Sequence, residues 1–499
     1  MKKIFPLIII AALLYIYGFS GDKYNSPSST FDYKVIDANE IKTVIFNDGE
    51  MDRGISPAGA GFEWPKNSNK FAIYSSGFWI GAKINDSIRV AIAEYGSAFK
   101  PGYFDFNTQT PQGQNDPSFR LYKVSPSLPN GNFEFDAWSL WPVSQGAEWV
   151  DANMNGIYEP PTDYPVMKGS QNLFCSFTDG YRDTSSNPLR TLPLRAEVHL
   201  YVWAKENPSC ADAINYEWKI INKNISAWTD MSAAIWSDVD IGSPVSDLAG
   251  TDSALNLVFG YKGINSDPVY GAAPPAVGYT VKEASGHGNQ KADFASRWRC
   301  GFDCPVNSTE IFNVMHGLKA NGNDWINPIT NRATKFPFSG DPDAATGWLD
   351  SSQGERYVII GSMMGSVASL DTVEFKTVTF IKRGSNNLTS VSEIKNCVSS
   401  VIGINNLSTS IPDGFKLYQN YPNPFNPTTN IKYQIVNSNY VELKIYNVLG
   451  KQVITLVNQK QNAGTYTVDW NSTGFPSGVY FYTIKAEEFQ QTKRMILLK

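Results

Sequence analysis

Apolar and polar residues alternate with a period of two along several short stretches of this chain. In Val441-Glu-Leu-Lys-Ile445 apolar and charged residues alternate, and in residues 194–204 aliphatic residues alternate with charged or larger polar and aromatic ones. Because successive side chains of a β-strand point to opposite faces, this pattern predicts half-buried strands. A chain built from such stretches has to form sheets that turn one face toward a core.

The composition of the 499 residues also favours sheets and turns over long charged helices. Hydrophobic residues make up 42%, aromatic residues 13% and charged residues only 18%, with 39 Gly and 29 Pro. We therefore predict a mainly β protein. A chain of this length is expected to form roughly two to four domains. The net charge of −5 offers no basic surface for phosphates, so nucleic acid is not an expected partner.

The N-terminus has the layout of a secretory signal peptide. Met-Lys-Lys precedes an apolar run over residues 4–19, and the small residues Gly18, Ser20 and Gly21 suit cleavage. The apolar run falls short of the roughly 20 residues that span a bilayer, and no later segment approaches that length. Residues 1–20 are therefore predicted to be removed, which leaves a protein that does not span a membrane.

The body of the protein is predicted from residues 21–403. An N-terminal β-rich region covers 21–165, and a β-sandwich covers 166–403 with a loop-rich insertion at 240–354. Residues 71–96 form a hairpin by pattern, because two apolar runs meet at Asn85-Asp86. Further strands are expected at 194–204, 214–222, 232–239, 356–361 and 373–382. The one helix expected in this part is 389–402, which Ser390 can cap.

The five cysteines are an odd number, so at least one thiol stays unpaired within the monomer. Cys300 and Cys304 are spaced to close a small disulfide loop in an oxidising compartment. Buried thiols are the alternative. A zinc site lacks two further ligands nearby.

A small, polar linker at 404–412 separates the body from a C-terminal domain at 413–499. Short strand-like runs follow one another closely, at 430–436, 441–446, 452–457, 465–470, 479–485 and 493–498. This spacing predicts a small Ig-like β-sandwich. Its first residues include Asn420-Tyr-Pro-Asn-Pro-Phe-Asn-Pro427, whose prolines cannot donate to a sheet. We expect this segment to run extended along the margin, with Tyr421 and Phe425 docked.

These motifs resemble the type A C-terminal sorting domain of proteins exported by the bacterial type IX secretion system. The similarity rests on residues 417–428, 443–451, 462–470 and 477–482 and on the terminal Lys493-Arg-Met-Ile-Leu-Leu-Lys499. It implies a folded signal that the secretion machinery reads, and a protein that is secreted or attached to the outer cell surface. An ordinary carbohydrate-binding or adhesive sandwich is the alternative.

The body resembles uncharacterised secreted proteins that carry the same tail. The similar stretches are residues 78–83, 151–160, 236–242, 274–278 and 340–350. Those proteins imply no activity that would transfer to this chain. The resemblance therefore leaves the ligand of the body open, with a glycan or a surface component as the partner to test.

Two groups of oxygen-bearing side chains are candidate calcium sites. In the first, oxygen ligands alternate before a glycine that permits a sharp turn, as a calcium loop requires. Its residues are Asp151, Asn153, Asn155, Ile157 through its carbonyl, Glu159 and Asp163. Thr162 stands where an EF-hand has Glu, and two prolines prevent a following helix, so a metal-free turn is the alternative.

The second candidate calcium site gathers four carboxylates within fifteen residues, where a strand runs into a loop. These are Asp238, Asp240, Asp247 and Asp252. Their mutual repulsion requires a cation or full solvation. A solvated acidic loop without a metal is one alternative, and a pair of acids for glycoside hydrolysis is another.

Other catalytic signatures are missing from the sequence. The three histidines stand far apart, without a His-Glu-x-x-His arrangement, and no Gly-x-Ser-x-Gly elbow or phosphate-binding loop is present. The tryptophans at 64, 79, 138, 141 and 149 fit a sugar-stacking platform or, more simply, packing on a sheet. We therefore expect a non-enzymatic structural or binding protein stabilised by calcium. A secreted hydrolase with a site in the 240–354 loops is the alternative.

Overall fold

The structure is a computed structural model. It describes residues 31–55, 59–126, 138–181, 191–206, 208, 212–287, 291–299, 303–401, 404–408, 415–436, 439–461, 464–472, 474–486 and 489–498. The predicted signal peptide and the residues Cys210 and Cys300 lie outside these ranges. The expected Cys300–Cys304 pairing therefore falls partly outside them as well.

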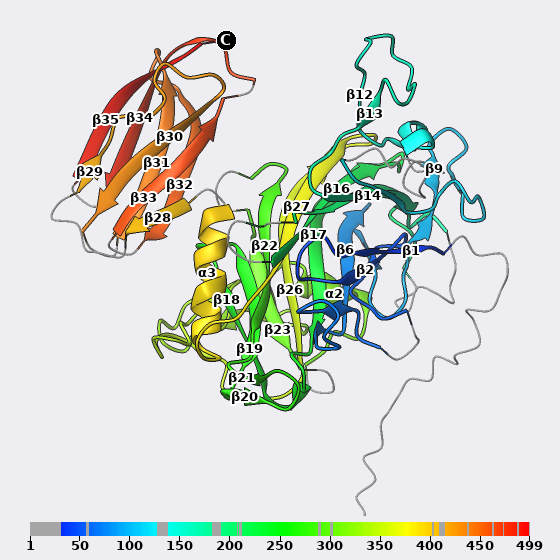
Figure 1. The fold of residues 1–499 in the computed structure, drawn as a ribbon, viewed down its shortest axis with the longest axis horizontal. Coiled ribbons are helices and arrows are strands. Elements are labelled where there is room, and N and C mark those ends of the chain that lie inside the picture. The colour runs from blue at the N-terminus through cyan, green and yellow to red at the C-terminus, as the bar shows by residue number, and fades with distance from the viewer. Residues whose placement is uncertain are drawn as a thin grey trace, which may run out of the picture.

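The body consists of large antiparallel sheets that pack face to face (Figure 1). The first sheet has the strand order β1-β2-β3-β6-β17-β26-β23, and β7 pairs with β6. Its strands are β1 (Tyr33–Ile36), β2 (Thr43–Phe46), β3 (Glu50–Met51), β6 (Ser75–Ile84), β7 (Ser87–Ile92), β17 (Trp228–Val239), β23 (Phe294–Trp298) and β26 (Arg356–Val367). The predicted hairpin is confirmed as β6 and β7, and Asn85 and Asp86 take positive φ angles of 50° and 61° at its turn.

The second sheet has the order β11-β14-β15-β16-β27-β22-β19-β18, and β8 pairs with β14. Its strands are β8 (Lys100–Pro101), β11 (Tyr122–Val124), β14 (Gln171–Thr178), β15 (Ala196–Ala204), β16 (Asp212–Asn222), β18 (Asp247–Asp252), β19 (Leu257–Lys262), β22 (Ala276–Ala284) and β27 (Thr372–Lys382). Residues 21–165 and 166–403 thus contribute strands to both sheets. The 240–354 stretch, which was expected to be rich in loops, also supplies β18, β19, β22 and β23.

The main core lies between the sheets. The alternating apolar residues of β15 all point into it, as predicted, and Phe78 of β6 stacks on Trp218 of β16 with ring centroids 4.3 Å apart. The outer face of the first sheet packs against α2 (Ser308–Val314) through Ile311 and Phe312. This arrangement buries aromatic residues on both sides of the first sheet.

Helix α3 (Thr389–Val401) confirms the predicted helix and covers one end of the outer face of the second sheet through Val391, Ile394 and Val398. Ser390 does not cap it. Instead Asn386 accepts hydrogen bonds from the backbone N–H groups of Leu388 and Thr389, both at 2.8 Å, because it lies one turn earlier and faces the exposed amides. Cys397 on this helix is buried and disulfide-bonded.

The body also contains short two-stranded ribbons and 3-10 turns outside the two large sheets. The paired ribbons are β4 (Phe62–Glu63) with β5 (Phe71–Ile73), β9 (Tyr103–Asp105) with β10 (Thr110–Gln112), β12 (Trp149–Val150) with β13 (Tyr164–Pro165), β20 (Ser266–Asp267) with β21 (Gly271–Ala272), and β24 (Trp325–Ile326) with β25 (Ala333–Thr334). The 3-10 turns are Val143–Gln145 and Pro244–Ser246. Figure 1 shows the β12–β13 ribbon projecting from the body, with the 151–163 loop at its tip.

The C-terminal part is a separate β-sandwich with its own core. One sheet has the order β28-β33-β30-β29 and the other β32-β31-β34-β35. The strands are β28 (Ile404–Ser408), β29 (Lys416–Leu417), β30 (Thr428–Ile435), β31 (Asn439–Asn447), β32 (Gln452–Gln461), β33 (Gly464–Asn471), β34 (Gly478–Ala486) and β35 (Phe489–Leu497). The six predicted strands are confirmed. Part of the expected linker forms β28, which pairs with β33.

Candidate functional site

The 151–163 loop is organised around one buried carboxylate. Asp163 is fully buried and accepts hydrogen bonds from the N–H groups of Ala152, at 2.9 Å, and Glu159, at 2.8 Å. Asp151 accepts from the N–H groups of Asn155 and Gly156, at 3.1 and 2.8 Å. Gly156 takes a φ of 76°, so it supplies the sharp turn that the pattern predicts.

The remaining oxygen-bearing side chains of this loop meet at Glu159. The amide groups of Asn153 and Asn155 donate to Glu159 Oε2 at 3.2 and 2.7 Å, while Ile157 donates its N–H to Asn155 Oδ1. The structure thus gathers the predicted residues in one loop, which is largely exposed except at the buried Asp163. Within the described residues, no three His, Cys, Asp or Glu side chains form a metal-holding group, and calcium at this loop stays a prediction.

The four aspartates of the second candidate calcium site have different partners. Asp238, on β17, accepts a hydrogen bond from the Tyr95 hydroxyl at 2.5 Å. Asp252 accepts from two backbone N–H groups and forms an ion pair of 3.2 Å with Lys395. Asp240 is half-buried, and burial together with the nearby Glu355 carboxylate raises its pKa to about 6.

Asp247 belongs to a fully buried ion pair with Lys262, at 2.8 Å, and Asp267 lies 3.5 Å from the same ammonium group. Burial raises the pKa of Asp247 to about 7, although Lys262 opposes this shift. Lysine side chains therefore supply positive charge next to Asp247 and Asp252. Calcium at these four aspartates also stays a prediction.

A buried acid that the sequence analysis missed lies at Glu50 on β3, where it is 1% exposed beside Asp48 and forms an ion pair with Arg53. Burial and the Asp48 carboxylate raise the pKa of Glu50 from 4.5 to about 8. The positive charges of Arg53 and Lys100 oppose this rise. A short Asn-Asp-Gly-Glu run in a sequence suggests an exposed turn. Only the strand pairing of β3 with β6 shows that it is buried.

This raised pKa predicts a pH-dependent stability. The pKa of Glu50 is higher in the folded than in the unfolded protein. The protonated carboxyl therefore contributes to stability below pH 4.5, and this contribution is lost as pH rises through about 8. We expect the melting temperature to fall over this window by several degrees more in the natural protein than in Glu50→Gln. Thermal melts across the window measure it. Parallel curves for the two proteins would contradict the assignment.

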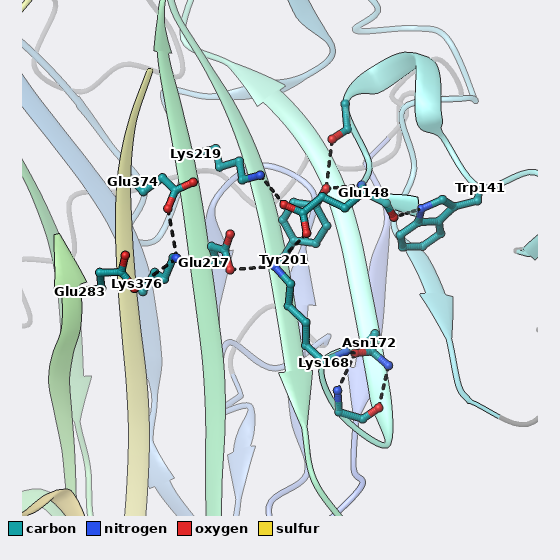
Figure 2. Close-up of polar contacts among 12 residues, drawn as sticks. Trp141, Glu148, Lys168, Asn172, Tyr201, Glu217, Lys219, Glu283, Glu374 and Lys376 are labelled. Atoms are coloured by element: carbon teal, nitrogen blue, oxygen red, sulfur yellow. Dashed lines mark hydrogen bonds and ion pairs between the residues drawn. The ribbon is translucent and has the colours of Figure 1, made fainter. Parts of the chain in front are cut away.

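The outer face of the second sheet carries a charged surface that the sequence analysis also missed. Across neighbouring strands, Tyr201 lies opposite Glu217, Glu217 opposite Lys376, and Lys376 opposite Glu283. Figure 2 shows Lys376 between Glu374 and Glu283, at 3.0 and 3.2 Å, and Lys168 reaching Glu217 at 2.8 Å. We call this surface the lysine–glutamate face.

The tryptophans proposed as a sugar platform serve packing. Trp138 and Trp141 are buried with Phe174 and Tyr201, whereas Trp79 is buried on the other sheet against α2. Trp79 lies in a different cluster from Trp138 and Trp141, so the five tryptophans form no common surface.

The characteristic segments of the C-terminal domain hold one another. Phe425 is buried in the core, its N–H donates to the carbonyl of Ile496, and its own carbonyl accepts from the N–H of Leu498. Asn423 Oδ1 accepts from the N–H of Ile496 at 2.8 Å. The proline-rich segment is thus hydrogen-bonded to the last strand. Tyr421 is 82% exposed rather than docked, because it lies on the outer side of the bridge to Asn430.

Residues 419–498 match the family described as the secretion system C-terminal sorting domain. The protein is therefore a cargo of the type IX secretion system, exported to the cell surface or the extracellular space. In the described part of the chain, no helix is both long and apolar enough to cross a membrane.

The comparisons add little about the body. No curated protein matches the chain. One similar solved structure is PorZ of Porphyromonas gingivalis, whose title calls it an essential bacterial surface component of the type IX secretion system. It shares 12% identity, with a TM-score of 0.14, over 94% of this chain and 58% of that chain. At this score the likeness supports no conclusion about the fold.

Proposed function

We propose that the body is a non-enzymatic binding or structural module that works outside the cell, where the sorting domain delivers it. One observation carries this proposal. Asp247 and Asp252, two of the four clustered aspartates, are engaged with Lys262 and Lys395. Carboxylates fixed in this way stabilise a scaffold and are poorly placed for proton transfer to a substrate.

We further propose that calcium binds the 151–163 loop and stiffens the projecting ribbon. Support comes from the gathering of its predicted ligands around a buried Asp163 at the tip of β12 and β13. A cation bound only to the folded loop stabilises the fold by about 2.7 kcal/mol at a hundredfold excess over its Kd.

The test is a pair of melting curves, one in calcium and one in chelator, where calcium should raise the melting temperature by a few degrees. Asp151→Ala should abolish this difference. Asp105→Ala is the matched control, since Asp105 also accepts from two backbone N–H groups, those of Asn107 and Thr108, in another exposed turn. A calcium response that is absent from the natural protein, or that survives in Asp151→Ala, would remove calcium from the proposal.

A secreted hydrolase remains the second candidate because of Asp240. Burial and Glu355 raise the pKa of this half-buried carboxyl to about 6, in the range of a general acid. A screen of polysaccharides and proteins decides between the candidates. Turnover that disappears in Asp240→Asn, in a variant with an unchanged melting temperature, would establish the enzyme and overturn the first proposal.

A further inference from the structure

A depression of about 190 Å³ lies on the lysine–glutamate face. It is lined by residues of four neighbouring strands, β15, β16, β27 and β22, and by Lys168 from the segment before β14. Trp203 and Asn215, which are opposite one another on β15 and β16, lie on one side of it, and Lys282 and Glu283 of β22 lie on the other. Its size suits a single small ring rather than a polymer chain in a deep groove.

A β-bulge places two successive charged side chains in this depression. The pairing of β22 with β27 shifts between Val281 and Glu283, so that Val281 points into the core while both Lys282 and Glu283 line the outer depression. Bulges redirect side chains and often occur next to functional sites. Without the shift, strict alternation would turn one of these two charged side chains inward.

Lys282 differs from the other lysines of the depression in its partners. Lys168 is paired with Glu148 and Glu217, and Lys376 with Glu283 and Glu374. Among the described residues, no carboxylate lies within ion-pair distance of Lys282, although its side chain is half-buried. Burial, together with the nearby Lys205, lowers the pKa of Lys282, although the Glu283 and Glu217 carboxylates oppose this shift. An ammonium group in this position gains most from an incoming anion.

The surrounding groups restrict what that anion can be. The Glu217 and Glu283 carboxylates would repel a multiply charged phosphate or sulfate, but they can accept hydrogen bonds from hydroxyl groups. Trp203 is partly buried and lines the depression with the rest of its ring, while the Lys168 ammonium lies 5.4 Å from the centroid of that ring. The groups therefore suit a ring with several hydroxyls and one negative charge.

Building on the proposed function, we propose that this depression binds a sugar carrying one carboxylate, of the hexuronic acid type. The sugar ring lies against Trp203, its hydroxyls bond Asn215 and Glu217, and its carboxylate pairs with Lys282. The ligand of the body is then an acidic glycan, recognised one residue at a time on the outer face of a sheet.

Glucuronic acid and glucose are the matched probes, because they differ only in the carboxylate at C6. Titration calorimetry and ligand-observed NMR on the full chain should show that glucuronic acid binds at least about tenfold more tightly than glucose, which corresponds to roughly 1.4 kcal/mol. The affinity should fall as salt is added. Sodium acetate carries the charge without the ring and should bind more weakly than glucuronic acid.

The variants identify the site. Lys282→Met should lose the preference for glucuronic acid, Lys282→Arg should keep it, and Lys83→Gln, on the other sheet, should have no effect. Equal binding of glucose and glucuronic acid, no binding of either, acetate binding as tightly, or an unchanged Lys282→Met would each overturn the inference. The calcium melts report on the proposed function separately, so a lost calcium response with intact glucuronic acid binding would remove one proposal and leave the other.

Discussion

Deletion of residues 413–499 should reduce the protein outside the cell to near background and leave it in the periplasm. These residues contain the sorting domain, which has its own hydrophobic core, and the body contains the core between its large sheets. The body should therefore stay folded without the tail. Immunoblots of periplasm, cell surface and medium from a host with a type IX system measure the distribution.

A point variant tests whether the sorting domain has to be folded or only has to be present in the chain. Leu443 is fully buried in the sorting domain, and Leu443→Asp places a charge there at a cost of several kcal/mol. This variant should be retained like the deletion. Glu442→Gln changes the neighbouring residue, whose side chain is 32% exposed, and should be exported normally. Normal export of Leu443→Asp would show that the machinery reads a linear motif rather than a folded domain.

Replacing Lys262 with methionine should destabilise the body by about 3–5 kcal/mol at about pH 8, because it leaves a buried carboxylate without its partner. Lys262 and Asp247 are both fully buried. The folded-state pKa of Asp247 is raised to about 7, so its contribution to stability is present below pH 3.8 and is lost as pH rises through about 7. The cost of Lys262→Met should consequently be much smaller near pH 5, where this carboxyl is protonated.

Denaturant unfolding at both pH values tests this expectation. The control is Lys395→Met, which removes an ion pair to Asp252 whose side chains are 15% and 23% exposed, and it should cost only about 0–1 kcal/mol at either pH. A loss for Lys262→Met that is equally large at both pH values would contradict the buried-charge explanation. Added calcium that restores the stability of Lys262→Met would instead show that a cation can occupy the position of this ammonium group.

Several parts of the fold were predictable because their signals are local. The alternation with a period of two predicted the strands of the sorting domain and strand β15. The Asn85-Asp86 pair predicted a hairpin, and the helical spacing of apolar residues predicted α3. The predicted ligands of the 151–163 loop lie within thirteen consecutive residues, so the sequence alone brought them close together. The cap of α3 was mispredicted within a short segment, since Asn386 and Ser390 both stand near the helix start and only the backbone geometry shows which side chain faces the free amides. Other features, such as the burial of Glu50 and the pairing of Lys376 with Glu283, escaped because they depend on partners far along the chain.

The sequence by itself determined that this protein is β-rich and where it is delivered. Both the alternation of apolar and polar residues and the motifs of the sorting domain lie within short segments of the chain. Tertiary structure decided which charges are buried and which strands lie together. Asp247 meets Lys262 only after β18 pairs with β19, and Lys282 and Trp203 line one depression only after four strands from distant parts of the chain assemble. Burial and charge pairing depend on contacts between segments, so a pattern of neighbours in sequence cannot specify them.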